Sequence, residues 1–245
     1  MNVAAAAGAA GTLGSAAPSG AVKLIEMRYY RMRNGNQVKR TTTYLQQHFA
    51  PAAERAGIAP VAFLSGAVTQ DSPSILVIKG YASYAAMGES LDKLAADKEY
   101  GAALAEFNSG PELSYMRYES CLLRAFDSVQ RIDVPSGGIL ELRTYESPNS
   151  GTLKRKIGMF EQGGEIDIFR KHGINPVFFG ETIIGRNMPN LTYMVAFDDF
   201  AARSKAWSAF GSSPEWQKLR AQPGLGDAEI VSNISNSIWS PLAKR

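Results

Sequence analysis

One pattern recurs along this chain of 245 residues at a spacing that changes by only one residue, and it constrains the fold more than any other feature. Ile25-Glu26-Met27-Arg28-Tyr29-Tyr30 resembles Leu140-Glu141-Leu142-Arg143-Thr144-Tyr145, which lies 115 residues later. Gly57-Ile58-Ala59-Pro60 resembles Gly173-Ile174-Asn175-Pro176 at a spacing of 116 residues, and further pairs follow at that spacing. A register that holds over so long a stretch predicts two copies of one structural unit.

Each copy contains the same order of expected elements. A strand with alternating large and polar residues comes first, at 23–32 and at 139–146. A helix follows, at 38–56 and at 152–172, and a glycine stands after each helix, where a helix commonly ends. The other expected elements are strands at 61–68, 74–81, 177–184 and 191–197, helices at 83–94 and 199–210, a short helix after Ser213, and final strands at 113–123 and 228–239. This order, βαββαβ, is that of a ferredoxin-like unit.

The repeat also predicts how the two units combine. A four-stranded sheet with helices on one face leaves its other face uncovered, so two such sheets are expected to cover each other. We therefore expect an α+β fold in which two ferredoxin-like βαββαβ halves pack sheet-to-sheet into one α/β barrel. The expected boundaries are a leader at 1–20, a first half at 21–126, a linker at 127–138 and a second half at 139–245.

The leader has a composition of its own. Residues 1–20 include eight alanines and four glycines, and no charged residue precedes Lys23. Such a segment is either an export signal without its basic start or a flexible leader. The first interpretation places the protein in the periplasm or outside the cell, and the second places it in the cytoplasm. No stretch after residue 20 is long and apolar enough to span a bilayer.

Composition excludes several classes of function. The net charge of +3 is small and the basic residues are scattered, which argues against a nucleic-acid partner. Cys121 is the single cysteine, so no internal disulfide forms, and with only two histidines a metal site is not expected. The glycines occur singly or in the linker rather than in a phosphate-binding loop. We expect neither a metal nor a nucleotide cofactor.

Three segments of the second half resemble the NIPSNAP family, within the wider dimeric α/β-barrel group. They are Leu140-Glu141-Leu142-Arg143-Thr144-Tyr145, Phe197-Asp198-Asp199-Phe200-Ala201-Ala202-Arg203 and Ser213-Pro214-Glu215-Trp216, and the resemblance covers about residues 139–241. In the first half, Met87 stands where the second half has Arg203, and Tyr100 stands where it has Trp216. The resemblance implies the fold only, because the wider group includes cofactor-free oxygenases, isomerases, haem enzymes and binding proteins.

The first strand of each half supplies the candidate site residues. Side chains alternate along a strand, so every second residue shares a face. One face of the two strands carries Glu26, Arg28, Tyr30, Glu141, Arg143 and Tyr145. Because the helices need the aliphatic face, we expect these six residues to point into the space between the sheets. There they would either line a cavity for a small organic ligand or form a buried polar network.

Other polar residues receive less specific interpretations. His172 is expected in the last turn of a helix, where the helix dipole favours it. His48 is expected within a helix as an ordinary core or surface histidine. Two basic pairs, Lys39-Arg40 and Arg155-Lys156, occupy equivalent positions near the start of a helix. We expect these basic side chains to extend into solvent.

These observations leave three functions open. The first is a small-molecule-binding α/β barrel, the second is a cofactor-free oxygenase or isomerase, and the third is a non-enzymatic scaffold for protein interaction. Self-association is compatible with each. A sizeable cavity between the sheets favours the first two, whereas a filled barrel with a large exposed apolar patch favours the third.

Overall fold

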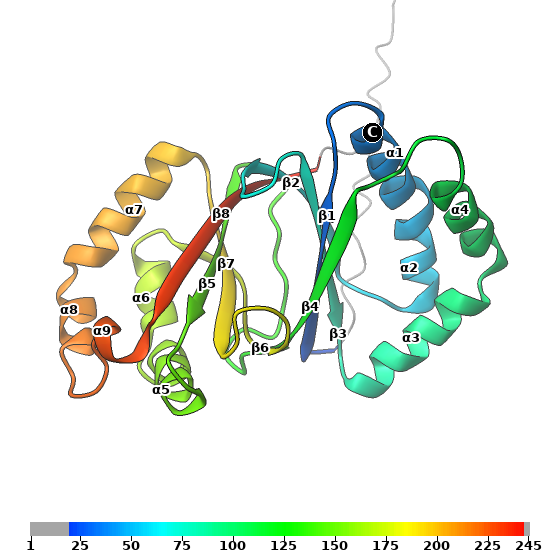
Figure 1. The fold of residues 1–245 in the computed structure, drawn as a ribbon. Helices are drawn as coiled ribbons and strands as arrows, with labels where there is room; N and C mark the ends of the chain where they lie inside the picture. Colours follow the sequence, from blue (N-terminus) through cyan, green and yellow to red (C-terminus); the bar gives the residue numbers. More distant parts are fainter. Residues whose placement is uncertain (1–19, 243–245) are drawn as a thin grey trace, which may run out of the picture.

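The computed structural model describes residues 20–242, in which eight strands close into one barrel. Helices cover two opposite sides of the barrel (Figure 1). The first half contains β1 (Leu24–Arg31), α1 (Asn36–Thr43), η1 (Tyr44–Phe49), α2 (Ala50–Ala56), β2 (Val61–Val68), β3 (Ser74–Tyr81), α3 (Tyr84–Ala96), α4 (Lys98–Asn108) and β4 (Arg117–Ala125). The second contains β5 (Ile139–Glu146), α5 (Ser150–Glu161), α6 (Glu165–Lys171), β6 (Asn175–Ile184), β7 (Asn190–Phe197), α7 (Phe200–Ser212), α8 (Pro214–Arg220), α9 (Asp227–Ile230) and β8 (Asn233–Pro241). The predicted leader lies outside the described residues, apart from Gly20.

The strand order confirms the predicted fold class. The first half has the order β2-β3-β1-β4 and the second has the equivalent order β6-β7-β5-β8. Two further antiparallel pairs, β4 with β6 and β8 with β2, join the halves and close the barrel. Each junction pairs the last strand of one half with the second strand of the other half, as expected for two copies related by a pseudo-two-fold axis. Closure leaves no unpaired sheet edge.

Glycine ends the first helical segment of each half, as predicted. Gly57 has φ 80° and caps α2, and Gly173 has φ 79° and follows the end of α6 at His172. A positive φ is readily adopted only by glycine, so the same residue stops the helix in both copies. His172 thus occupies the helix end at which the sequence placed it.

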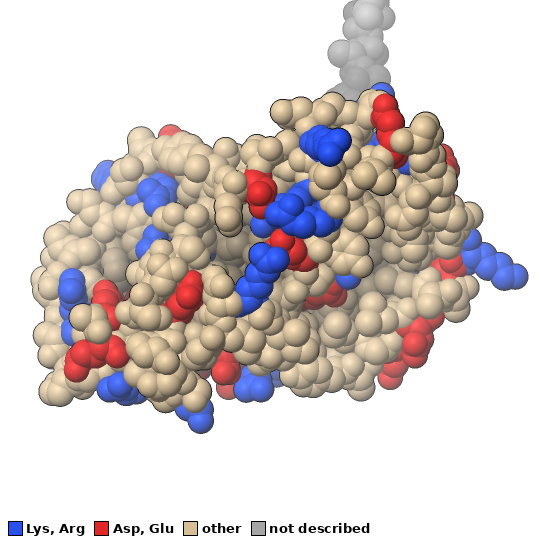
Figure 2. Space-filling view, in the orientation of Figure 1, with Lys and Arg blue, Asp and Glu red and all other residues tan. Residues whose placement is uncertain are grey.

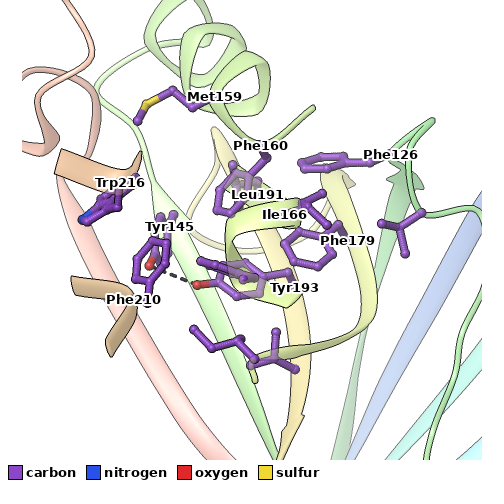
Figure 3. Packing of buried hydrophobic residues seen from close by; sticks show 14 of the residues in the cluster. Phe126, Tyr145, Met159, Phe160, Ile166, Phe179, Leu191, Tyr193, Phe210 and Trp216 are labelled. Atoms are coloured by element: carbon purple, nitrogen blue, oxygen red, sulfur yellow. Dashed lines mark hydrogen bonds between the residues drawn. The ribbon is translucent and has the colours of Figure 1, made fainter. Parts of the chain in front are cut away.

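An aromatic core binds the second half's sheet to its helices (Figure 3). The rings of Phe179 and Tyr193 stack in parallel with centroids 4.7 Å apart. Tyr193 donates a hydrogen bond of 3.0 Å to the hydroxyl of Tyr145, and Phe160 packs against both tyrosines. Fully burying such side chains contributes about 1.5–3 kcal/mol each. A corresponding core in the first half includes the stacked rings of Tyr44 and Phe107.

The barrel interior is filled at one end. Apolar residues from both halves meet there, including Ile25, Leu123, Leu140 and Phe178. The chain between the halves runs across this end and adds Ile132 and Val134 to the same core. Backbone hydrogen bonds of 2.9 Å from Val22 to Gln130 and 3.1 Å from Asp133 to Val177 hold the connection in place. We call this the closed end and the opposite end, where β1 and β5 finish, the mouth.

Several elements differ from the sequence-based expectation. The single helix expected at 152–172 is instead two helices, α5 and α6, with a break at 162–164. Helix α4 was not expected, and it begins where the Asp97 side chain accepts a hydrogen bond from the backbone of Tyr100. The last strand was expected from residue 228, but Glu229 caps the backbone of Gly226 and stabilises the short helix α9 instead. Within the first helical segment, η1 is a π-helix that contains the exposed His48.

Candidate ligand-binding site

The candidate residues of the second half contact helices. Glu141 of β5 is fully buried and accepts hydrogen bonds from Arg203 at 2.7 and 2.8 Å and from Trp207 at 2.7 Å, both on α7. Arg143 and Asn236 donate to the same carboxylate at 2.8 and 3.2 Å. Arg143 also lies over the Trp207 ring, 4.7 Å from its centroid. The carboxylate of Glu141 is therefore surrounded by donors that fix α7 on the sheet.

These donors determine the charge state of Glu141. Burial by itself would raise the pKa of this carboxyl group, but the hydrogen bonds from Arg203 and Trp207 and the charge of Arg143 hold that pKa below its usual range. A carboxylate that accepts so many hydrogen bonds is a poor proton acceptor. Glu141 is thus an anchor for the helix rather than a general base.

In the first half, the buried carboxylate of Glu26 has different partners. Glu26 of β1 pairs with Lys79 of β3 at 2.5 Å and accepts a hydrogen bond of 3.1 Å from Tyr81. Arg28 completes the cluster at 3.2 Å from Glu26. Met87 replaces the arginine that would reach across from the helix, so strand residues supply the buried cation. Tyr30 packs in the core between the sheet and the helices.

The prediction that these six residues face the space between the sheets is wrong. Alternation along β1 and β5 correctly separates two faces, but the aliphatic face fills the closed end of the barrel and the charged face contacts the helices. The physical reason is that eight strands enclose an interior whose filled part has no room for water, so aliphatic residues belong there. The two carboxylates, Glu26 and Glu141, find their partners on strand β3 and on helix α7. The polar network joins elements within each half rather than joining the halves.

A cavity of about 810 Å³ occupies the mouth of the barrel. Its floor includes Met27, Leu142 and Trp239, which also belong to the barrel core. Above them the aliphatic faces of β1 and β5 become polar, at Tyr29 and Arg31 and at Thr144. The volume is within the range of small-molecule sites, and the lining residues come from both halves.

Charged side chains form an alternating row at one side of the mouth. Arg31 and Arg117 both approach Asp71 Oδ2, at 3.3 and 3.2 Å. Arg117 and Arg186 both approach Glu119 Oε1, at 3.3 and 3.2 Å. We call these five residues the charged row; it begins and ends with arginine and so carries one excess positive charge. Figure 2 shows side chains of both signs gathered over the middle of the molecule, between the two helical layers.

The opposite side of the mouth is uncharged. Thr144 and Thr192 share a hydrogen bond of 2.9 Å, and Asn190 accepts hydrogen bonds from Thr192 at 3.3 Å and from Thr182 at 2.6 Å. Ser235 and Ser237 of β8 add two more hydroxyl groups to the lining. In the repeat, Ser235 is the counterpart of Glu119, and both face the first strand of their own half in the same register. The two copies therefore contribute chemically different walls to one cavity.

The thiol of Cys121 also lines this cavity. Burial raises the pKa of the thiol to about 12. The thiolate form, which is the nucleophile, is therefore scarce at neutral pH. In residues 20–242, no three histidine, cysteine, aspartate or glutamate side chains gather as a metal-binding group.

A comparison with known protein families shows which family the second half of the chain resembles. Residues 140–244 match the sequence model of the NIPSNAP family. This half of the chain is a NIPSNAP domain. A comparison with curated proteins found no match.

The structure explains two of the segments that resemble NIPSNAP proteins. The segment at 197–203 ends in Arg203, whose guanidinium binds Glu141 of the opening strand. The segment at 213–216 begins with Ser213, whose hydroxyl accepts a hydrogen bond of 3.3 Å from the backbone of Trp216 and caps α8. The resemblance is thus carried by residues that anchor α7 to the sheet and cap α8.

Solved structures share the fold over most of the chain. A candidate monooxygenase from Lactobacillus acidophilus has a TM-score of 0.58 at 8% identity, with 89% of this chain and 93% of that chain covered. A candidate monooxygenase from Fusobacterium nucleatum has a TM-score of 0.54 at 11% identity, with 91% and 94% covered. An anthrone oxidase-like protein has a TM-score of 0.53 at 11% identity, with 91% and 92% covered. At these identities the likeness extends to the fold alone.

The NIPSNAP domain also holds a buried ion pair that the sequence did not predict. Lys156 of α5 was expected to extend into solvent, yet its side chain is 1% exposed and lies 3.2 Å from Glu165 of α6. Its ammonium group lies over the rings of Tyr145, Phe160 and Trp216, with centroids 4.9 to 5.4 Å away. Aromatic faces attract a cation, which explains why the lysine turns inward. Burial raises the pKa of Glu165 to about 7.

Two further hollows lie outside the barrel. One of about 470 Å³ includes Leu24, Tyr84 and Ile157 in its lining, and one of about 540 Å³ lies beside α1, η1 and α4 and includes His48. In the second, Arg40 does not extend into solvent as expected but donates hydrogen bonds to backbone carbonyls of α4 and the residue after it. Neither hollow combines residues of both first strands, as the mouth does.

Proposed function

We propose that this chain is a small-molecule-binding α/β barrel and that the mouth of the barrel is its binding site. The cavity of about 810 Å³ carries the proposal, because an apolar floor and two different polar walls converge on it. Such a combination holds an organic molecule by its apolar part and fixes its orientation by a few polar contacts. No helix in residues 20–242 is long and apolar enough to cross a membrane.

The chemistry of the lining favours binding over catalysis. Each carboxylate in the charged row is shared by two arginines, so its oxygens are engaged in ion pairs rather than directed at a bound molecule. The thiol of Cys121 is held protonated by its raised pKa. The remaining polar groups are mainly hydroxyls and amides, which orient a ligand without exchanging protons at neutral pH. The cavity at the mouth likewise favours ligand binding over a purely structural role for the barrel.

Filling the mouth should abolish binding. Ser235 lines the cavity from β8 and is exposed there, so Ser235→Trp should place an indole in the cavity with little disturbance of the core. Ser208→Trp on the exposed side of α7 is the matched control. A set of small aromatic acids, amides and amines can be screened by saturation-transfer NMR with wild type and both variants. We expect ligand signals with wild type and Ser208→Trp, and their loss with Ser235→Trp.

Two results would contradict the proposal. Equal signals from Ser235→Trp and wild type would place the site outside the mouth. The absence of signals from all three proteins would remove the binding function itself.

A further inference from the structure

Arg31 is the most constrained cation of the mouth. Its position at the end of β1 continues the interior face formed by Ile25, Met27 and Tyr29. The side chain is only 13% exposed, and its guanidinium lies over the Tyr29 ring, 5.2 Å from the centroid. Burial in this wall holds the guanidinium at the edge of the cavity rather than out in solvent.

The hydrogen-bonding capacity of Arg31 is largely unused. Its Nε lies 3.3 Å from Asp71, yet this buried atom makes no hydrogen bond of acceptable geometry. A guanidinium carries five N–H donors, and buried donors are almost always paired. Asp71 cannot satisfy them alone, because the same oxygen also faces Arg117. Within residues 20–242, the contacts of Arg31 thus leave donors for an acceptor that enters from the cavity.

The other residues that line the mouth indicate what kind of molecule would supply this acceptor. The charged row has one excess positive charge, which a single negative charge balances. The floor of Met27, Leu142 and Trp239 suits an apolar body. A planar carboxylate matches the planar fork of a guanidinium. A singly charged carboxylate therefore fits this row better than a doubly charged phosphate.

We propose that the mouth selects organic carboxylates with an apolar body, and that Arg31 binds the carboxylate group. This inference rests on the proposed binding function and adds the class of ligand and the residue that selects it. The apolar body lies against the floor while the carboxylate accepts hydrogen bonds from Arg31. The hydroxyl groups of the opposite wall then recognise polar substituents along the body.

The test compares two probes that differ only in charge. Dissociation constants are measured for 2-naphthoate and for neutral 2-naphthamide with wild type, Arg31→Gln, Arg31→Lys and the control Arg124→Gln. Arg124 lies on the outward face of β4, where it pairs with Glu181. We expect Arg31→Gln to weaken naphthoate binding by about 10- to 100-fold, as expected for loss of hydrogen bonds to a charged group. Arg31→Lys should recover part of the loss, and Arg124→Gln should match wild type.

The neutral probe separates this inference from the proposed function. If Arg31→Gln binds naphthamide as wild type does, the cavity is intact and the loss of naphthoate binding is due to the missing guanidinium. If wild type binds both probes equally and Arg31→Gln changes neither, the carboxylate selection is wrong while the binding function stands. If Arg31→Gln loses both probes equally, Arg31 shapes the cavity and does not select charge.

Discussion

Replacing Glu141 with glutamine is expected to lower the free energy of unfolding by about 3–5 kcal/mol, because two arginines lose their buried anion. The carboxylate is fully buried and receives hydrogen bonds from Arg143, Arg203, Trp207 and Asn236. Glutamine keeps the size of the side chain but places an NH₂ group among donors. Urea unfolding followed by tryptophan fluorescence and circular dichroism measures the change.

Glu181→Gln is the matched control for this prediction. Glu181 is also on a strand of the second half, but its partner Arg124 is 62% exposed and lies 3.4 Å away. An exposed pair of this kind contributes about 0.2–1 kcal/mol. Equal losses from the two variants would show that the Glu141 network does not anchor α7.

Replacing Lys156 with methionine is expected to destabilise the protein by about 3–5 kcal/mol at pH 8, because Glu165 would be left buried without a cation. The loss should be smaller at pH 5. Lys156 lowers the pKa of Glu165 against the effect of burial, so its removal raises that pKa further. At low pH the glutamate is protonated in the folded state and no longer needs the ammonium group. Urea unfolding at both pH values tests the difference, and a loss independent of pH would contradict it.

Glu165 itself should make stability depend on pH. Its folded pKa of about 7 lies above an unfolded value of ~4.3. Below ~4.3 the group is protonated in both states, and between these values only the folded state holds the proton. Its contribution therefore favours folding at low pH and is lost as the pH rises toward 7, by about 3 kcal/mol at most. Glu165→Gln should remove this part of the pH dependence, and an unchanged profile would contradict the raised pKa.

The repeat predicted the architecture because both copies obey the same physical requirement. Each sheet has one face without helices, and the spacing of 115 to 116 residues that relates the opening strands and the glycines Gly57 and Gly173 shows that both copies contain these elements in the same order. Closure into a barrel follows from joining them. The additional helix α4 was missed although the repeat could have indicated it, because Asp97 caps α4 at the position equivalent to Ser213, which caps the expected helix α8.

The orientation of the first strands could not be derived from alternation alone. Glu141 and Leu142 lie on opposite faces in either orientation, and partners far along the chain decide between them. One signal did exist, because the face that carries Leu140 and Leu142 turns polar at Thr144. The equivalent face of β1 ends in Arg31. A polar end on an otherwise aliphatic face indicates an interior that opens to solvent.

The charged row could not be predicted from the sequence, for a different reason. Asp71 follows β2, Arg117 begins β4, and Arg186 lies between β6 and β7. These residues are far apart in the sequence and meet only because the barrel brings strands of both halves to one mouth. No short motif contains them.

Alkylation of Cys121 tests the binding site most directly. Cys121 is the only cysteine and lines the mouth, so the mass that N-ethylmaleimide adds to the peptide containing Cys121 reports access to the cavity. Because the thiol pKa is raised, the rate is measured at about pH 9, where more thiolate forms. Saturating 2-naphthoate should slow the modification of wild type and of Ser208→Trp several-fold. An unchanged rate, with naphthoate shown by NMR to be bound, would place the ligand outside the barrel and contradict the account.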